Sequence, residues 1–161
     1  MKKQLYIAYG SNLNREQMEH RCPTAKPIAK SCLPGFKLVF QGFAFGAHAN
    51  VIPAEGSEVP VVVWEIGPKD ELFLDRYEGV AGGYYTKEYM QVDVNGEMKE
   101  ALIYIMSPHG YGIPGDTYLN VIAEGYKDFE LDIRALNDAV SEALRKVRRE
   151  FRLKAQGATR W

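Results

Sequence analysis

Residues 4–13 read Gln-Leu-Tyr-Ile-Ala-Tyr-Gly-Ser-Asn-Leu, and this stretch decides how the fold begins. The apolar and aromatic run from Gln4 to Tyr9 predicts a buried strand, which Gly10-Ser11-Asn12 ends abruptly. A turn that begins with glycine can expose consecutive backbone N–H groups, and a concave row of such groups binds an anion or a developing oxyanion. An ordinary connection from a strand to a helix uses the same turn residues, so the turn alone does not establish a site.

A second distinctive stretch, residues 74–85, reads Leu-Asp-Arg-Tyr-Glu-Gly-Val-Ala-Gly-Gly-Tyr-Tyr. We predict that a helix with Pro68 in its first turn ends near Tyr77, because glycines follow. Glu78 then lies where the helix stops, and a carboxylate there can point into a cleft while glycines let the backbone approach a ligand. The alternative for a glutamate at a helix end is a solvated surface charge.

The first two thirds of the chain are rich in apolar and β-branched runs that Gly and Pro residues separate. Asn95-Gly96 predicts a hairpin turn, because a type I′ turn needs two residues that tolerate positive φ. Helices are predicted after Asn14 and after Asp116, each residue acting as an N-cap. Six or seven short strands with few helices predict a small barrel or a strongly curved sheet. The runs expected as separate strands before the Pro68 helix include Lys37–Phe40, Ala49–Ile52 and Val59–Ile66.

The final third changes character. Apolar residues recur at steps of three or four, which predicts one stripe along a helix: Leu136, Val140, Leu144, Val147 and Phe151. Residues 141–161 carry a net charge of +5, from seven Lys or Arg and two Glu, while the rest of the chain carries −6. A solvated helix with its stripe on the core explains this imbalance, and a tail that faces RNA or a membrane is the alternative. We expect one domain over residues 1–161, with a core over 1–130 and a basic amphipathic helix over 131–161.

Composition restricts the classes of function. A chain of 161 residues that is 46% hydrophobic, with 20 basic and 21 acidic side chains, suits one folded domain without a general affinity for nucleic acid. The apolar run after the N-terminus is too short for a signal peptide, and no stretch reaches the roughly 20 apolar residues of a membrane helix. Two cysteines fit neither a zinc site nor a redox motif. We expect a soluble protein of the reducing cytoplasm.

Several common kinds of catalytic site lack support in the sequence. His20, His48 and His109 stand in different segments, so no two of them have the spacing of metal ligands. Neither a G-x-S-x-G nucleophile motif nor a phosphate-binding loop occurs. The chemistry therefore has to be sought at the turn around Gly10 and at Glu78.

Together these two stretches resemble the γ-glutamylcyclotransferase-like family. The resemblance depends on Tyr-Gly-Ser-Asn at 9–12 and Leu-Asp-Arg-Tyr-Glu-Gly at 74–79, in this order and at this separation. It covers about Leu5 to Asp128 and leaves the helix after Leu131 unmatched. It implies an α+β fold, a small mixed β-barrel flanked by helices, with a cavity that holds a γ-glutamyl group.

Enzymes of that family convert γ-glutamyl amides into 5-oxoproline and a free amine or amino acid, without a cofactor or a metal. The resemblance implies that Glu78 is the acid/base residue and that the turn holds the glutamyl moiety, largely through backbone groups. The implied substrate-binding residues are Tyr9, Gly10, Ser11, Asn12, Leu13, Tyr85 and Tyr118.

Other interpretations stay open at this point. The same pocket could bind a small acidic molecule or a protein partner without catalysis, and the basic C-terminal helix could bind RNA. Neither the amine half of the substrate nor the oligomeric state follows from the sequence, and a homodimer is among the options. We expect a small-molecule partner, with neither nucleic acid nor membrane bound.

Overall fold

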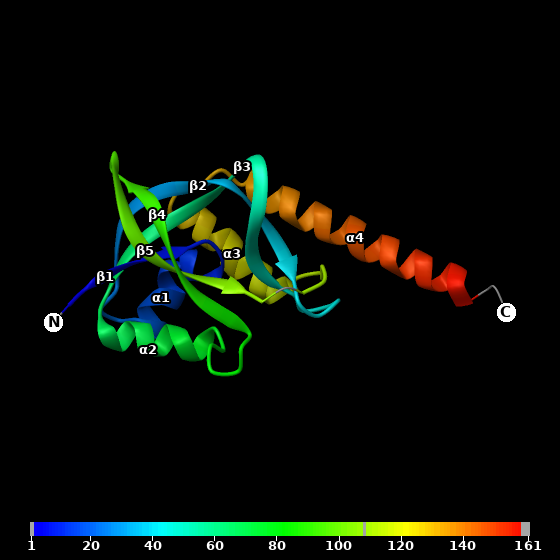
Figure 1. Ribbon diagram of the computed structural model, residues 1–161, viewed down its shortest axis with the longest axis horizontal. Helices are drawn as coiled ribbons and strands as arrows, with labels where there is room; N and C mark the ends of the chain where they lie inside the picture. Colours follow the sequence, from blue (N-terminus) through cyan, green and yellow to red (C-terminus); the bar gives the residue numbers. More distant parts are fainter. Residues whose placement is uncertain (1, 108, 159–161) are drawn as a thin grey trace.

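The computed structural model describes residues 2–107 and 109–158 of the chain (Figure 1). Over these residues a mixed sheet is combined with helices, which confirms the predicted α+β class. The elements are β1 (Gln4–Ala8), the short 3-10 helix η1 (Ser11–Leu13), α1 (Arg15–Arg21), β2 (Lys26–Gln41), β3 (His48–Ile66), α2 (Pro68–Tyr77), β4 (Tyr85–Val94), β5 (Glu97–Met106), α3 (Asp116–Asp128) and α4 (Arg134–Ala158).

The first strand lies in the middle of the sheet, whose order is β2-β3-β1-β5-β4. Tyr6 of β1 is the register partner of Trp64 in the antiparallel β3 and of Leu102 in the parallel β5. The β4–β5 hairpin turns at Asn95 and Gly96, whose φ values are 53° and 92°, so the predicted turn is confirmed. A central β1 places the turn that follows it at the heart of the fold.

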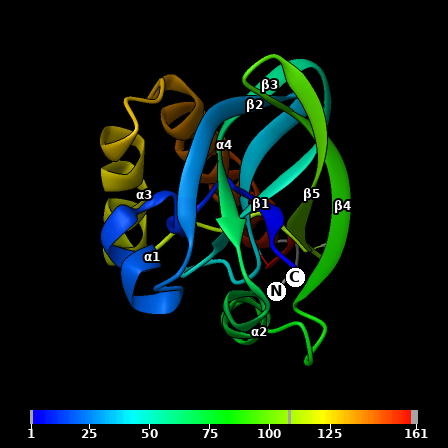
Figure 2. The ribbon, with the colours of Figure 1, turned by 90° about the vertical axis from the view of Figure 1, so that its left-hand side faces the viewer.

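The sheet is strongly curved, but it does not close into the barrel that we expected (Figure 2). The edge strands β2 and β4 approach each other, and no hydrogen-bonded ladder joins them within the described part of the chain. Pro27 and Pro34 in β2 cannot donate a backbone hydrogen bond, which suits an edge strand, and the β2–β3 register shifts directly after each of them. These shifts bend the edge strand without pairing its free side.

The structure also has fewer and longer strands than the six or seven expected, with five strands over the described residues. Ala49–Ile52 and Val59–Ile66, predicted as separate strands, are parts of the 19-residue β3. Pro53 and Gly56 lie between them, yet β3 stays paired with β2 on both sides of these residues. The residues that suggested loops are therefore bends within one long pair of strands.

Local signals placed most helix ends correctly. The side chain of Asn14 accepts a hydrogen bond from Gln17 N at 2.9 Å and caps α1, as predicted. Pro68 begins α2, also as predicted. Asp116 is not the cap of α3, because Gly115 with φ −67° and ψ 152° takes that position. Asp116 instead lies in the first turn, where its charge is favourable at the positive end of the helix dipole.

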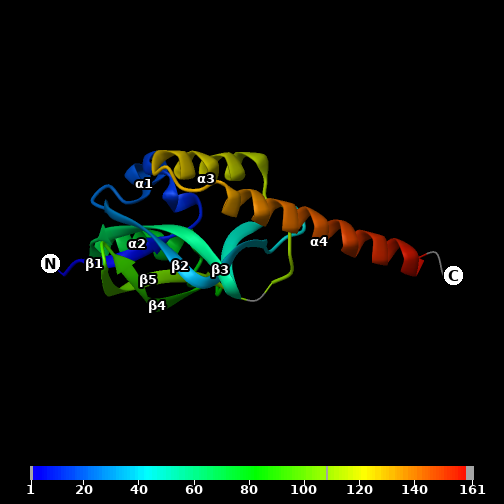
Figure 3. The ribbon, with the colours of Figure 1, turned by 90° about the horizontal axis from the view of Figure 1, so that it is seen from above.

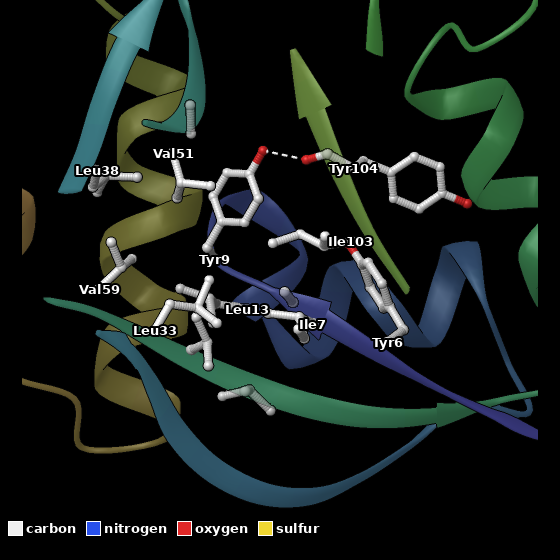
Figure 4. Packing of buried hydrophobic residues seen from close by; sticks show 14 of the residues in the cluster. Tyr6, Ile7, Tyr9, Leu13, Leu33, Leu38, Val51, Val59, Ile103 and Tyr104 are labelled. Atoms are coloured by element: carbon white, nitrogen blue, oxygen red, sulfur yellow. Dashed lines mark hydrogen bonds between the residues drawn. The ribbon is translucent and has the colours of Figure 1, made fainter. Parts of the chain in front are cut away.

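Helices α1 and α3 lie together on one side of the sheet and enclose the turn after β1 (Figure 3). The side chain of Leu13 is fully buried in the core beneath this turn (Figure 4). Gly125 of α3 packs directly on it, since a Cβ atom at Gly125 would lie 2.6 Å from Leu13 Cβ. The turn is therefore held in place by a helix that comes more than a hundred residues later.

The long helix α4 packs on β2 with its first half and then extends away from the rest of the molecule (Figure 1). Of its predicted stripe, Leu136 and Val147 are buried, whereas Leu144 and Phe151 are 42% and 47% exposed. The ring of Phe151 stacks on Phe45 at 6.0 Å. The predicted packing of the stripe on the core is thus confirmed only in part. None of the helices in the described part of the chain combines the length and the apolar character that crossing a bilayer requires.

Candidate active site

A cavity of about 150 Å³ opens where β1 ends and where α2 stops. Its volume is roughly ten times the ~10–15 Å³ that one water molecule needs, so it suits a small polar ligand. Seven of the ten tyrosines of the chain line it. The lining residues are Tyr6, Tyr9, Gly10, Ser11, Asn12, Arg21, His48, Ala49, Tyr77, Glu78, Tyr84, Tyr85, Tyr104 and Tyr118.

The turn after β1 forms one wall of the cavity. Leu13 N donates to Gly10 O at 3.0 Å, which closes the single 3-10 turn. The first N–H groups of such a turn, those of Ser11 and Asn12, have no acceptor within it. Gly10 has a φ of −119°, so it does not adopt the left-handed conformation that favours glycine. Close packing favours glycine, because a Cβ atom there would lie 3.1 Å from the Cβ of Ala49.

The end of α2 fixes the position of Glu78. Gly79 adopts φ +63°, Gly79 N donates to Arg76 O at 3.2 Å, and Val80 N donates to Asp75 O at 3.0 Å. This pair of bonds is the Schellman motif, in which a glycine after the cap reverses the chain. Glu78 is the cap residue itself, so its side chain points from the helix end into the cavity.

Asn12 connects the turn to Glu78. Its side-chain oxygen accepts from Gln17 Nε2 at 3.1 Å and from Arg21 Nη1 at 3.0 Å. Its amide nitrogen donates to the Tyr6 hydroxyl at 2.9 Å and to Glu78 Oε1 at 3.4 Å. Two donors on the oxygen fix the orientation of the amide, which therefore presents its N–H groups to Tyr6 and Glu78.

Burial raises the pKa of Glu78 to about 7, from an ordinary value of 4.5. The guanidinium of Arg21 acts in the opposite direction and does not cancel the effect. Glu78 is the one carboxylate and Arg21 the one permanently charged cation among the lining residues. A carboxyl group with a pKa near neutrality can both accept and return a proton, which is what general acid–base catalysis requires.

Hydrogen bonds to backbone atoms hold the tyrosine walls in place. The Tyr9 hydroxyl donates to Tyr104 O at 2.6 Å (Figure 4), and the Tyr85 hydroxyl donates to Ala49 O at 2.6 Å. Tyr118 differs, because its hydroxyl oxygen accepts from Ala49 N at 2.9 Å. Ala49 of β3 thus joins two walls of the cavity.

The structure brings together seven of the eight residues that the sequence proposed as site residues. Glu78, Tyr85 and Tyr118 line the cavity together with residues 9–12. Leu13 does not reach it, since its side chain is in the core and its N–H is bonded within the turn.

Sequence reasoning missed other residues that line the cavity, among them Tyr6, Arg21, His48 and Tyr104. For Arg21 the sequence holds a weak signal: α1 is short and is capped at Asn14, so its last residue, Arg21, stays close to Asn12. His48 was considered only as a metal ligand; it lies beside Tyr84, with Nδ1 2.8 Å from the hydroxyl. Within residues 2–107 and 109–158, no three His, Cys, Asp or Glu side chains gather as a group that could hold a metal ion.

Comparison with known proteins agrees with this geometry. The family described as "Gamma-glutamyl cyclotransferase, AIG2-like" matches residues 6–126. The chain belongs to this family. It is 33% identical over 132 residues to the γ-glutamylcyclotransferases of Mus musculus and of Homo sapiens, a match that covers 77% of this chain and 70% of each relative.

Comparison with solved structures shows the same fold. One titled "Gamma-glutamyl cyclotransferase" superposes with a TM-score of 0.78 and 28% identity, covering 86% of both chains. A yeast structure titled as a γ-glutamyl cyclotransferase specific to glutathione superposes with a TM-score of 0.60 over 91% of this chain and 97% of its own. The latter shares 12% identity and supports the fold alone. Membership of the family supports a cyclotransferase activity in general.

Proposed function

We propose that this protein cyclises a γ-glutamyl amide or γ-glutamyl amino acid to 5-oxoproline and releases the free amine, with Glu78 as the general acid/base. The observation that carries the proposal is the cavity in which the Glu78 carboxyl, bonded to Asn12, faces the turn at residues 10–12. We also infer that the reaction takes place in the cytoplasm, which suits the two free thiols, and that it uses no cofactor.

The substrate supplies its own nucleophile in this reaction. Its α-amine attacks its γ-carbonyl carbon, a new C–N bond closes the five-membered ring, and the original C–N bond to the amine breaks. The α-ammonium loses two protons in becoming the lactam N–H, and the departing nitrogen gains two in leaving as an ammonium. Glu78 takes the proton that must leave before the attack and returns a proton to the departing nitrogen as its C–N bond breaks, and water carries the other. Well-oriented intramolecular reactions recover roughly 7–11 kcal/mol of barrier, so the protein needs to fold the substrate and transfer the proton.

The raised pKa of Glu78 suits it to transfer that proton. An ordinary Glu, with a pKa near 4.3, would accept a proton from an α-amine of pKa about 8 at a cost of about 5 kcal/mol. With Glu78 at about 7, the same transfer costs about 1.4 kcal/mol. The protonated carboxyl can then donate to the leaving nitrogen.

The polar groups of the cavity suit an anionic ligand that carries carbonyl groups. N–H groups of Ser11 and Asn12 and the guanidinium of Arg21 are donors, and Glu78 is the one anion among the lining residues. Backbone N–H groups placed in this way bind a carboxylate or stabilise an oxyanion. A γ-glutamyl group has both an α-carboxylate and a γ-carbonyl oxygen to present to them.

A panel of γ-glutamyl amines and γ-glutamyl amino acids tests the proposal, with 5-oxoproline detected by mass spectrometry. The wild-type protein should form 5-oxoproline from at least one of them, and Glu78→Gln should lose at least 100-fold in kcat while its circular dichroism is unchanged. Tyr89→Phe, an exposed change outside the cavity, is the control and should retain full turnover. A wild-type protein that binds a panel member but forms no 5-oxoproline would instead be a binding module.

A further inference from the structure

The tyrosine hydroxyl groups around the cavity differ in the hydrogen bonds that they make. Three donate their proton to an acceptor in the protein: Tyr9 to Tyr104 O, Tyr85 to Ala49 O, and Tyr104 to Asp75 Oδ1 at 2.7 Å. The hydroxyl of Tyr84 is paired with His48. The oxygens of Tyr6 and Tyr118, in contrast, accept hydrogen bonds, from Asn12 and from Ala49 N.

Tyr6 therefore has a proton to donate. Its oxygen accepts from the amide of Asn12, whose orientation is fixed because Gln17 and Arg21 both donate to the other end of that amide. A phenol donates one hydrogen bond in addition to those it accepts. Within the part of the chain that the structure describes, no acceptor is found for the Tyr6 O–H. Tyr6 is only 4% exposed, so the remaining partner has to come from inside the cavity.

The position of this hydroxyl is set relative to Glu78. One nitrogen, Asn12 Nδ2, lies 2.9 Å from the Tyr6 oxygen and 3.4 Å from Glu78 Oε1. The Tyr6 hydroxyl and the Glu78 carboxyl thus flank the same part of the cavity, because both accept from this one amide nitrogen. Tyr118 is on a different wall, bonded to β3 beside Gly10. Of the hydroxyls of Tyr6 and Tyr118, that of Tyr6 is the one next to the carboxyl.

We propose that the Tyr6 O–H donates a hydrogen bond to the γ-carbonyl oxygen of the substrate and stabilises the negative charge that develops there during ring closure. This inference rests on the proposed function. When the α-amine attacks, the electron pair of the γ-carbonyl double bond moves onto the oxygen, and it returns when the C–N bond to the amine breaks. Tyr6 keeps its proton throughout, while Glu78 carries a proton from the α-ammonium to the departing nitrogen.

Chemistry and environment both favour a neutral donor at this position. Burial and the negative charge of Glu78 raise the pKa of Tyr6, so the phenol stays protonated wherever Glu78 is ionised. A donor next to the acid/base residue meets the γ-carbonyl oxygen, since this oxygen and the two nitrogens that Glu78 serves are all bonded to the γ-carbon. A buried and fixed donor needs no reorganisation as the charge forms.

Steady-state kinetics of Tyr6→Phe test this role. Loss of one oxyanion donor lowers kcat by roughly 10²–10³-fold, and we expect this fall with KM within about threefold of wild type, because the contact strengthens in the transition state. Tyr126→Phe is the matched control: it also removes a buried tyrosine hydroxyl, one that lies outside the cavity and has no hydrogen-bond partner among residues 2–107 and 109–158. It should leave kcat and KM unchanged.

The outcomes separate the two proposals. A wild-type protein without cyclisation activity overturns the proposed function, whereas an active wild type with an unchanged kcat in Tyr6→Phe overturns only the role of Tyr6. A rise in KM with normal kcat would make Tyr6 a ground-state contact and would also overturn it.

A crystal structure with bound 5-oxoproline provides a second measurement if Tyr6→Phe fails to fold. The lactam oxygen of 5-oxoproline is the former γ-carbonyl oxygen. We expect it within about 3.0 Å of the Tyr6 hydroxyl. A product bound with its α-carboxylate at Tyr6, or with the lactam oxygen beyond hydrogen-bond distance, would refute the assignment.

Discussion

Replacing Glu78 by Gln should make the folded protein more stable at alkaline pH. The Glu78 carboxyl has a pKa of about 7 in the folded protein and the ordinary value of 4.5 in the unfolded chain, so the folded state binds the proton more tightly. Stability is therefore lost as the pH rises from about 4.5 to 7, where the unfolded chain releases the proton first. Relative to Glu78→Gln, wild type loses about 3 kcal/mol of unfolding free energy above pH 8 and less than about 1 kcal/mol at pH 5.

Urea unfolding at pH 5 and at pH 8.5 measures this difference directly. We expect Glu78→Gln and wild type to have similar free energies of unfolding at pH 5, and the variant to exceed wild type by about 3 kcal/mol at pH 8.5. For a chain of this length that corresponds to about 6–12 °C in Tm. Glu88→Gln, which removes an exposed carboxyl on β4, controls for the loss of one charge. If the two unfolding free energies differ by the same amount at both pH values, Glu78 is not the buried, proton-retaining group described above.

Two further substitutions probe the cavity walls. Gly10→Val places side-chain atoms against Ala49, so we expect KM for cyclisation to rise at least tenfold. Gly110→Val is the control and should leave KM unchanged, because open space surrounds that glycine. Equal KM values in the two variants would show that the turn is not a binding wall. Arg21→Met removes the charge that lowers the pKa of Glu78, so the acid limb of the kcat/KM profile should move to higher pH. Arg21→Lys should restore the limb, and an unmoved limb in Arg21→Met would contradict the assignment.

Features that depend on a few neighbouring residues were predictable from the sequence. Asn14 as a cap, Pro68 at the start of α2 and the turn at Asn95-Gly96 all follow from backbone preferences of single residues. The position of Glu78 belongs to this group, because a glycine after a helix end selects the Schellman geometry. Local chemistry was therefore enough to place the acid/base candidate at a helix end.

Features that depend on distant packing were not predictable. No local pattern pairs Asp75 with Tyr104, yet the carboxylate of Asp75 accepts from the hydroxyl of Tyr104, 29 residues later. Arg21 reaches Asn12 only because α1 folds back beside the turn. The merging of short runs into β3 likewise required the partner strand β2, whose register shifts absorb the prolines. In each case the deciding contact depends on how segments fold against one another, for which the sequence holds at most a weak local signal.

The two halves of the site meet because α2 and β1 have matching lengths. β3 runs antiparallel to β1, so α2 starts beside the beginning of β1, where the Gln4 side chain bonds to Glu71. The 10 residues of α2 then span about 15 Å, while the 5 residues of β1 span about 17 Å. The helix therefore ends level with the turn after β1, and Glu78 reaches Asn12 there. One helical turn more or less in α2 would move the carboxyl by about 5.4 Å along the helix axis. The length of this helix is thus as much a condition for the site as the glutamate itself.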